Sequence, residues 1–288
     1  MPASFRDRFG PWAFIAGASM GIGAAFSHQA AARGLNVVML ARGRELLEAT
    51  AADVAAAHGV QTRTIAADLA DPEIARTVAD AIAGLDVGLF VYNAAVAPHG
   101  YFLDTDLELQ QLSVTVNCTT LLSLLNLLVP PMAERGRGGV GLVSSLGGIS
   151  GAIKFGTYNA AKAYQWILGE SLWTELGERG IDVSTVMVGA TSSPNYNSFQ
   201  ATLDPALCDK ADTDSALDRA RWRLMHPSTP DDAAVALYEH LGKGPVCYAS
   251  PDDAWVAQRC LSSTREESIA VWRQLQETSL RAPDRIAR

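Results

Sequence analysis

A tyrosine and a lysine four residues apart form the pair with the clearest chemical potential in this sequence. Tyr158 and Lys162 lie in the segment Thr157–Leu176, where apolar spacing predicts a helix, and residues four apart share a helical face. An ammonium beside a phenol stabilises the phenolate and lowers the tyrosine pKa from about 10, which favours proton exchange near neutral pH. Lysine is rare here, with 4 in the chain against 19 arginines. Taken alone, however, the spacing favours an ordinary amphipathic helix surface over a catalytic pair.

A glycine cluster follows the first apolar run, at a predicted junction between a strand and a helix. Gly17, Gly21 and Gly23 are separated by three residues and by one residue. Glycine lets a backbone approach a phosphate that a Cβ would block, and the helix N-terminus supplies N–H groups and a positive dipole end. A tight turn is the alternative, but the position favours a nucleotide-binding loop. The predicted contacts are Gly17, Ser19, Gly21, Ile22 and Gly23.

The end of the second apolar run predicts which nucleotide binds. An acidic residue there would accept a hydrogen bond from a ribose 2′-hydroxyl and repel a 2′-phosphate. The sequence instead has Ala41-Arg42-Gly43-Arg44, so Arg42, supported by Arg44, is placed to pair with a 2′-phosphate. NADP(H) is therefore favoured over NAD(H), with a solvated arginine at a helix start as the alternative.

Two further strand ends carry polar residues that suit a nucleotide cleft. Asp68-Leu69 follows the third apolar run, where a carboxylate can accept a hydrogen bond from an adenine amine. Asn93-Ala94 follows the fourth, where the Asn93 amide can tie neighbouring strand ends together and line the cleft.

Short apolar runs alternate with longer segments of helical periodicity along the chain. This alternation, with strands that are apolar throughout, predicts an α/β fold: a doubly wound parallel sheet of the Rossmann type, covered by helices on both faces. The expected strands are Trp12–Ala16, Val37–Leu40, Thr64–Ala66, Val87–Tyr92, Val140–Val143, Val183–Val188 and Pro245–Ala249. The expected helices are Gly21–Arg33, Glu45–His58, Pro72–Ala83, Leu107–Met132, Thr157–Leu176, Asp231–Leu241 and Arg265–Glu277.

Length and composition limit the domain count and the partners. The 288 residues can bury one α/β core, so we predict a single domain over 1–288, with a C-terminal helical extension over about 252–288. A net charge of −8 leaves no basic excess for nucleic acid or for an anionic membrane. Polar residues interrupt the most apolar stretch, Leu107–Met132, so no membrane span is expected. The scattered cysteines and the polar N-terminus predict no metal site, no disulfide and a cytoplasmic location.

Together these residues resemble the single-domain form of the short-chain dehydrogenase/reductase family. The separations of 13 residues from Ser145 to Tyr158 and of 41 residues from Asn117 to Tyr158 agree with that family. The resemblance runs from about Phe9 to Gly189. The matching positions are Gly17, Gly21, Ile22, Gly23, Asp68, Asn93, Ala94, Asn117, Ser145, Tyr158, Lys162 and Gly189.

The resemblance implies roles for four catalytic residues. Tyr158 would exchange a proton with the carbonyl or alcohol oxygen, which Ser145, rather than Ser144, would orient. Lys162 would bind the nicotinamide ribose and lower the Tyr158 pKa. Asn117 would hold a water molecule that links Lys162 to solvent. Hydride would pass between the nicotinamide and the substrate carbon, with reduction as the expected direction for NADPH.

Three positions depart from the family pattern. Ala16 stands where the family has threonine, and Ala95 adds a methyl group beside the cofactor. Val188-Gly189 replaces Pro-Gly in the loop that grips the nicotinamide amide, for which Thr191 is the candidate contact.

A finer resemblance is to the branch of 17-beta-hydroxysteroid dehydrogenases and very-long-chain 3-oxoacyl-CoA reductases. It is carried by Phe9–Ala13, Gly84–Gly88, Tyr101–Asp104, Val116–Cys118 and Leu128–Arg135.

In this fold the polar, partly helical stretch 192–225 implies a substrate lid. Candidate substrate contacts are Phe155, Tyr196 and Phe199, and Trp222 and Met225 are further large apolar residues of this stretch. Together these side chains favour a bulky apolar ketone as the substrate. Each of them alone could simply pack the segment against the protein. His99 and His226 are expected to be ordinary loop residues.

The leading hypothesis is an NADPH-dependent reductase of a bulky apolar ketone (ketosteroid-like, 3-oxoacyl-like or aryl), reversible as an alcohol dehydrogenase. The alternatives are an NAD-linked alcohol dehydrogenase and a non-catalytic nucleotide-binding regulator. The segments Leu107–Met132 and Thr157–Leu176 carry more apolar side chains than one face of the sheet would cover. In the family that this chain resembles, these two helices form the dimer interface, so the resemblance implies a homodimer or homotetramer.

Overall fold

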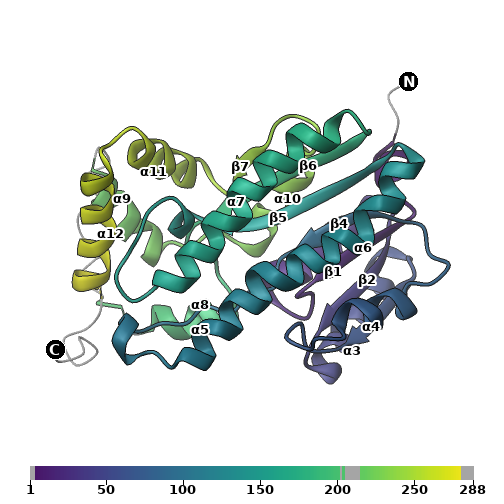
Figure 1. The fold of residues 1–288 in the computed structure, drawn as a ribbon, viewed down its shortest axis with the longest axis horizontal. Coiled ribbons are helices and arrows are strands. Elements are labelled where there is room, and N and C mark those ends of the chain that lie inside the picture. The colour runs from purple at the N-terminus through teal and green to yellow at the C-terminus, as the bar shows by residue number, and fades with distance from the viewer. Residues whose placement is uncertain (1–3, 202, 205–214, 280–288) are drawn as a thin grey trace.

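Seven parallel strands build one sheet in the computed structural model, which describes residues 4–201, 203–204 and 215–279 (Figure 1). The strand order is β3-β2-β1-β4-β5-β6-β7, and each neighbouring pair is parallel. This confirms the predicted doubly wound sheet. The strands are β1 (Trp12–Ala16), β2 (Asn36–Ala41), β3 (Thr62–Ala66), β4 (Val87–Tyr92), β5 (Gly138–Ser145), β6 (Ile181–Val188) and β7 (Val246–Tyr248).

Helices cover both faces of this sheet because its strands are apolar on both sides. In β1, Phe14 packs in one buried cluster with Leu121 and Leu124, whereas Ile15 packs in the other with Phe26. Figure 1 shows α6 and α7 crossing one face. The helices are α1 (Phe5–Phe9), α2 (Gly21–Ala32), α3 (Arg44–His58), α4 (Ile74–Ala81), α5 (Leu107–Val114), α6 (Thr120–Arg135), α7 (Gly156–Gly177), α8 (Pro194–Gln200), α9 (Ala216–Met225), α10 (Pro230–His240), α11 (Pro251–Leu261) and α12 (Arg265–Ser279).

The segment predicted as one long helix over Leu107–Met132 is interrupted. A π-helical turn, Thr115–Thr119, separates α5 from α6. The run Leu107–Arg135 is the one helical stretch of the described residues that is long and apolar enough to cross a membrane, because an 18-residue window within it has a mean hydropathy of 1.7. Half of that window is buried inside the protein, and a core helix passes the same test, so the run is weak evidence for a span.

The strand order reverses at β1, which lies between β2 and β4. In open α/β sheets a ligand binds beyond the carboxyl ends of the strands at such a reversal. The register pairs Ala16 with Leu40 on one side and with Tyr92 on the other. The loops that begin at Gly17, Arg42 and Asn93 therefore leave the sheet next to one another.

The C-terminal helices α9, α11 and α12 gather at one end of the molecule, to the left in Figure 1. Val256 and Cys260 of α11 pack with Leu146, Ile149 and Met187, near the carboxyl ends of β5 and β6. Within the expected lid, α8 and α9 are helical, whereas 202 and 205–214 lie outside the described residues. Residues 280–288 of the expected extension also lie outside them.

Candidate active site

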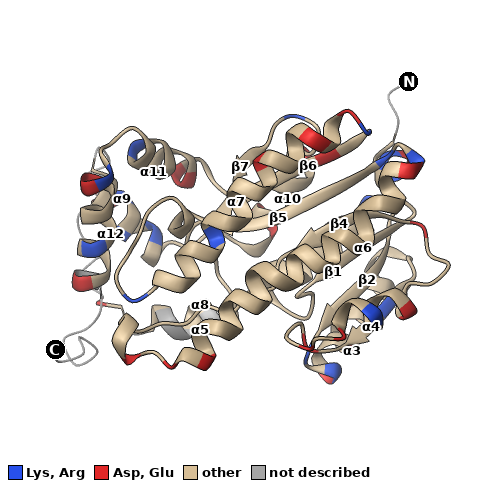
Figure 2. Ribbon diagram, in the orientation of Figure 1, with Lys and Arg blue, Asp and Glu red and all other residues tan. Residues whose placement is uncertain are grey.

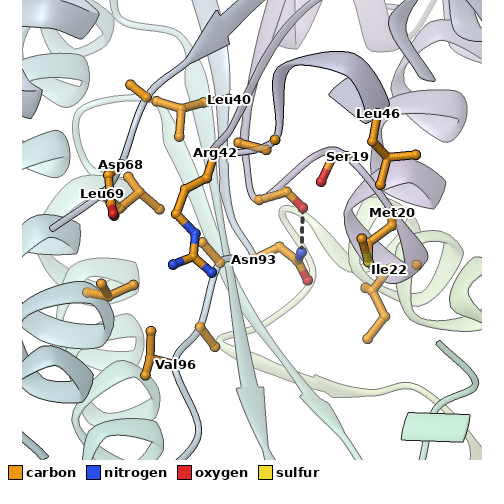
Figure 3. A pocket seen from close by; sticks show the side chains of 18 of the residues that line it. Ser19, Met20, Ile22, Leu40, Arg42, Leu46, Asp68, Leu69, Asn93 and Val96 are labelled. Atoms are coloured by element: carbon orange, nitrogen blue, oxygen red, sulfur yellow. Dashed lines mark hydrogen bonds between the residues drawn. The ribbon is translucent and has the colours of Figure 1, made fainter. Parts of the chain in front are cut away.

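A cleft of about 460 Å³ opens at the carboxyl ends of β1, β2 and β4 (Figure 3). Ser193, at the start of α8, and Leu112, of α5, also line it and were not predicted. Gly23, which was also predicted to bind the cofactor, does not line the cleft. The predicted cofactor-binding residues that line the cleft are Gly17, Ser19, Gly21, Ile22, Arg42, Asp68, Leu69, Asn93 and Ala94.

The glycine loop is built so that no side chain intrudes. Gly17 has φ +81°, and a Cβ there would lie 2.8 Å from the Ala94 backbone. A Cβ on Gly23 would lie 1.8 Å from the Gly17 carbonyl oxygen, so only glycine lets α2 pack this close. The N-cap of α2, Met20, gives the helix no side-chain hydrogen bond. The first N–H groups of α2 therefore remain available to a phosphate.

Asn93 ties the glycine loop to the end of β4. Its Nδ2 donates to the Gly17 carbonyl oxygen at 3.0 Å, and its backbone N–H donates to the Ala16 carbonyl oxygen at 3.1 Å. At the other side of the cleft, one oxygen of Asp68 accepts from the Ala70 N–H at 2.9 Å. The cleft wall is thus fixed by hydrogen bonds between strand ends.

Arg42 is the cation at the ribose end of the cleft. Figure 3 shows its guanidinium extending into the cleft between Leu69 and Asn93. Arg42 is exposed, and no carboxylate of the described residues lies within 4.0 Å of it. Arg44, expected to assist, instead pairs with Glu48 on its own helix at 3.3 Å and does not line the cleft. Of Arg42 and Arg44, therefore, only Arg42 presents its guanidinium to the cleft.

Ser145 and Tyr158 meet beyond the ends of β5 and the start of α7. The Ser145 side chain lies close enough to Tyr158 to act on the pKa of the Tyr158 hydroxyl, which it lowers. The Ser145 Oγ accepts from the Gly147 N–H at 3.1 Å, which leaves its own hydrogen for another oxygen. The neighbouring Ser144 is fully buried and donates to the Lys162 carbonyl oxygen at 2.7 Å. Ser145 thus lies next to Tyr158, whereas Ser144 links β5 to α7 through its hydrogen bond.

Lys162 does not lower the Tyr158 pKa as we expected. Burial raises the pKa of Tyr158, and the neighbouring Ser145 side chain acts in the opposite direction. The Lys162 Nζ lies 5.7 Å from the centre of the Tyr158 ring. Burial also lowers the pKa of Lys162 to about 7, so this lysine is only partly charged at neutral pH. A partly neutral amine stabilises a phenolate poorly, which is the physical reason for the difference.

Gln165 is a site residue that our sequence analysis missed. The Lys162 ammonium donates to Gln165 Oε1 at 2.9 Å and to the Val143 carbonyl oxygen at 2.7 Å. The Gln165 Nε2 donates in turn to the Asn117 peptide oxygen at 2.8 Å. Gln165 thus joins Lys162 to the backbone of Asn117, while the water molecule expected at Asn117 stays a prediction. A glutamine three positions after Lys162, on the same helical face, was the available signal.

Asn117 lies in the π-helical turn and is fully buried. Its Oδ1 accepts from the Val96 N–H at 3.0 Å, and its Nδ2 donates to the Val96 carbonyl oxygen at 2.7 Å. These bonds hold the turn against the loop after β4 and explain why the helix widens there. The side chain of Asn117 therefore shapes the site, and its peptide oxygen holds Gln165.

The loop after β6 is held from the C-terminal helices. Gly189 donates its N–H to Asp253 Oδ2 at 3.4 Å, and a Cβ at Gly189 would lie 2.2 Å from Asp253 Oδ1. Asp253 is fully buried and pairs with Arg223 at 3.2 Å. Thr191, the predicted amide contact, donates to the Gly189 carbonyl oxygen at 3.3 Å. Neither Gly189 nor Thr191 lines the 460 Å³ cleft.

Of the predicted substrate contacts, Phe155 lies beside Tyr158 in the structure. Its ring centre lies 6.1 Å from that of Tyr158 and 4.8 Å from that of His99. Tyr196 instead donates its hydroxyl to the Leu224 carbonyl oxygen at 2.6 Å, which fastens α8 to α9. Trp222 stacks on His226 at 4.5 Å. The Phe199 side chain lies outside the described residues.

No cluster of three or more His, Cys, Asp or Glu side chains that could hold a metal ion occurs within 4–201, 203–204 and 215–279. The described cysteines, Cys118, Cys247 and Cys260, are free thiols.

The fold and this site define a class of protein. A doubly wound sheet, a glycine loop at its switch point and a Ser–Tyr–Lys group beside the cleft are the parts of a nicotinamide-dependent oxidoreductase. The sequence matches the short chain dehydrogenase family over residues 11–204. The chain belongs to the short-chain dehydrogenase family and is an oxidoreductase that acts on hydroxyl or keto groups.

Named relatives act on steroids and related ketones. A 7beta-hydroxysteroid dehydrogenase from Collinsella aerofaciens is 35% identical over 192 residues, which are 67% of this chain and 73% of the relative. A very-long-chain 3-oxoacyl-CoA reductase from Aspergillus clavatus is 36% identical over 65% of this chain and 56% of the relative. Together with a match to 17-beta-hydroxysteroid dehydrogenase type 3, these relatives confirm the branch that the motifs indicated.

Two solved structures extend the likeness to nearly the whole chain. A 7beta-hydroxysteroid dehydrogenase structure covers 93% of this chain and 98% of its own, with a TM-score of 0.82 and 30% identity. A short-chain dehydrogenase from Sphingobium yanoikuyae in complex with NADPH covers 90% of this chain and 96% of its own, with a TM-score of 0.71 and 25% identity.

Proposed function

We propose that this protein is an NADPH-dependent reductase of a ketone on a bulky apolar substrate, reversible as an alcohol dehydrogenase. The observation that carries the proposal is the placement of Ser145 beside Tyr158, with the Nζ of the buried Lys162 at 5.7 Å from the centre of the Tyr158 ring. Ser145 ends β5, the strand next to β4, whose carboxyl end borders the 460 Å³ cleft. A regulator without catalysis would have no need for this pair beside a buried lysine.

In the proposed reaction, the bound nicotinamide supplies the hydride that the carbonyl carbon receives. The Tyr158 hydroxyl donates its proton to the carbonyl oxygen as that oxygen gains negative charge. Ser145 donates a second hydrogen bond to the same oxygen, which its contact with Gly147 leaves it free to do. Lys162, with its Nζ near the Tyr158 ring, is the residue that would bind the nicotinamide ribose.

The pKa of Tyr158 leaves its hydroxyl protonated, as the reductive step of the proposed reaction requires. Burial raises this pKa, so the hydroxyl keeps its proton at neutral pH. A protonated phenol is the form that a carbonyl reduction consumes, whereas alcohol oxidation needs the phenolate.

The cofactor preference rests on Arg42. This exposed guanidinium extends into the cleft at the end of β2, where the chain carries no acidic residue that would repel a 2′-phosphate. The NADPH complex of the Sphingobium yanoikuyae protein shows that this fold accepts the phosphorylated cofactor. The rival proposal, an NAD-linked alcohol dehydrogenase, predicts equal or better turnover with NADH.

The test follows the loss of reduced-nicotinamide absorbance with NADPH and NADH in parallel. The panel holds ketosteroids, 3-oxoacyl thioesters and aryl ketones, with Tyr158→Phe as the inactive control. We expect turnover of at least one panel member with NADPH and none in the control. Turnover that survives in Tyr158→Phe, or tight NADPH binding without turnover of any ketone, would overturn the proposed reaction.

We also propose a homodimer or homotetramer located in the cytoplasm. Figure 2 shows α6 free of charged residues until its C-terminal end. Large apolar side chains remain exposed on α6 and α7, among them Leu122 at 45%, Ile167 at 54% and Trp173 at 40%. Such a surface marks an interface. Multi-angle light scattering should give at least twice the 30.6 kDa chain mass, and a monomeric peak would refute the assembly.

A further inference from the structure

A short 3₁₀ turn, η3 (Leu146–Gly148), follows directly after the end of β5 and is capped by the Ser145 side chain. The Ser145 Oγ accepts from the Gly147 N–H at 3.1 Å, which makes Ser145 the N-cap of the turn, and Ile149 is its C-cap. A single 3₁₀ turn has poorer internal hydrogen bonds than an α-helix. Its geometry, and with it the direction of the Ser145 hydroxyl, therefore depends on contacts from outside the turn.

The glycines of η3 lie directly on α7, the helix that carries Tyr158. A Cβ on Gly148 would lie 2.9 Å from the Ala163 backbone nitrogen. A Cβ on Gly147 would lie 2.6 Å from the side-chain oxygen of Asn159, the residue that follows Tyr158. The absence of a side chain at both positions thus lets the turn and α7 pack in close contact.

The apolar residues next to these glycines pack on the C-terminal helices. Leu146 and Ile149 belong to one buried cluster with Val256 and Cys260 of α11. Trp272 of α12 is partly buried against the same cluster. The turn after Ser145 is therefore in contact with α7 through its glycines and with the final helices through its apolar side chains.

Arg265 adds a polar contact to this packing. It is the first residue of α12, and its Nη1 donates to the Ile149 carbonyl oxygen at 2.7 Å. Thr264 and Glu267 exchange hydrogen bonds of 2.9 and 3.2 Å at the start of α12, which fixes its first turn. A charged donor makes the bond to the carbonyl stronger than a neutral one would. Arg265 thus holds the C-cap of η3, while Ser145 forms its N-cap.

The contact matters because of what η3 does for Ser145. In the proposed reaction the Ser145 hydroxyl donates to the carbonyl oxygen, and the Gly147 N–H directs it by occupying an acceptor position on Oγ. When the Ile149 carbonyl loses its partner, the turn can loosen from its C-terminal end, and the Gly147 N–H is no longer held against Oγ. The direction of the hydroxyl would then be less well defined.

We propose that Arg265 is a positioning residue of the active site, which acts on Ser145 through η3. This inference rests on the proposed function, because Ser145 has its role toward the carbonyl oxygen only there. No residue of η3 lines the 460 Å³ cleft, so Arg265 should affect the chemical step and leave cofactor binding unchanged. The family match ends at residue 204, so a residue outside it would contribute to the reaction and not only to the stability of the fold.

The kinetic experiment measures Arg265→Ala and Arg265→Lys with NADPH and the best ketone of the panel. Arg265→Ala should lower kcat about threefold to tenfold, as expected for the loss of one hydrogen bond, while the KM for NADPH stays within about twofold. Arg265→Lys should recover most of this loss, since an ammonium can donate to the same carbonyl oxygen. Arg273→Ala, which removes an exposed pair with Glu277 on the same helix, is the matched control and should keep the wild-type rate.

A double-mutant cycle tests whether Arg265 acts through Ser145. In a Ser145→Ala background the hydroxyl that the arginine positions is already gone. Adding Arg265→Ala should then lower the single-turnover rate by less than about twofold. The same threefold to tenfold loss in both backgrounds would overturn the assignment, since Arg265 would then act on something other than Ser145.

Hydrogen exchange followed by mass spectrometry gives a readout that does not depend on turnover. Its reporters are the amides of Gly147 and Ile149, which donate within the turn. Arg265→Ala should speed their exchange and leave the glycine loop at its wild-type rate, and Arg273→Ala should change neither.

These measurements separate the two proposals. If wild type reduces no ketone of the panel but the amides of η3 are still released in Arg265→Ala, the proposed function fails and the contact that holds the turn stands. If wild type turns over a ketone while exchange in η3 is unchanged in Arg265→Ala, or rises equally throughout the chain, the assignment of Arg265 is overturned and the reductase proposal survives.

Discussion

The nucleotide end and the C-terminal end of this molecule are held together in different ways. At the nucleotide end, the cleft is formed by loops that leave adjacent strands and by backbone contacts, such as the close packing of Gly17 against Gly23. At the C-terminal end, α9 and α11 hold the loop after β6 through side chains, with Arg223 and Asp253 at the centre. The family match ends at residue 204, although the structural likeness to a 7beta-hydroxysteroid dehydrogenase covers 93% of the chain.

This difference separates what each region contributes. Backbone contacts of the glycine loop suit any dinucleotide, so the nucleotide end has the features of a general cofactor site, and under the proposed function Arg42 is the cation that selects between cofactors. The C-terminal end positions Gly189 and Thr191 through a buried ion pair that depends on two side chains 30 residues apart. We therefore expect variants at the two ends to fail in different ways: the first in cofactor use, the second in stability.

The largest expected effect concerns Tyr158, which lies between the two ends. Tyr158→Phe removes the proton donor and should lower kcat by about 10²- to 10⁴-fold, while NADPH still binds. Stopped-flow absorbance measures the turnover, and fluorescence titration measures cofactor binding. Tyr164→Phe, on an exposed part of the same helix, is the matched control and should keep its activity. A Tyr158→Phe enzyme with more than a tenth of the wild-type rate would contradict this role.

The next effect tests the C-terminal end. Asp253→Asn leaves the buried Arg223 charge without its partner, and the free energy of unfolding should fall by about 3 kcal/mol or more. Urea unfolding followed by circular dichroism measures the change. Arg273→Gln breaks an exposed pair with Glu277 and should change it by less than about 1 kcal/mol. Equal small losses in both variants would show that the buried pair does not hold this end.

A smaller and selective effect is expected at the nucleotide end. Arg42→Ala should raise the KM for NADPH by about tenfold or more, because one charged partner of the 2′-phosphate is lost, and it should leave the KM for NADH nearly unchanged. Arg44→Ala, whose side chain pairs with Glu48, should affect neither cofactor. An equal loss for NADPH and NADH in Arg42→Ala would refute the assignment of the cofactor.

The smallest effect is a shift of the pH profile through Gln165. Lys162 has a pKa of about 7, and its charged form is stabilised by the Gln165 Oε1 acceptor. If the ammonium is the active form, activity falls as pH rises through this pKa. Gln165→Leu removes the acceptor and should move the fall to lower pH, whereas Gln165→Glu adds an anion and should move it to higher pH. Profiles of kcat/KM from pH 5 to 10 check the direction, and identical profiles in all three proteins would reduce Gln165 to a packing role.

The parts that were predictable from the sequence are those built by local patterns. The apolar runs predicted the position of every strand to within a few residues, and β1 and β4 begin and end at the predicted residues. The spacing of the glycines and the basic residue at position 42 predicted where the cleft lies and several of the residues that line it. In both cases neighbouring residues in the chain are also neighbours in the site, so spacing alone carried the information.

The parts that were missed depend on contacts between distant segments. Gln165 acts through the Asn117 peptide oxygen, 48 residues away, and Asp253 reaches Gly189 across 64 residues. The interruption of the helix after Val114 follows from the Asn117 amide binding the Val96 backbone, which periodicity does not reveal. The effect of Lys162 on Tyr158 was also mistaken, because the burial of both groups is a property of the folded packing and not of their spacing.

The contact between Gly189 and Asp253 also limits how this chain can be recombined with its relatives. Asp253 Oδ1 lies where a Cβ of residue 189 would stand, so any larger residue at 189 requires a smaller one at 253. A chimera that joins this N-terminal sheet to another protein's final helices would have to exchange both positions in one step. Gly189 and Asp253 are therefore best exchanged together, even though nearly all of the recognisable motifs lie in the N-terminal part.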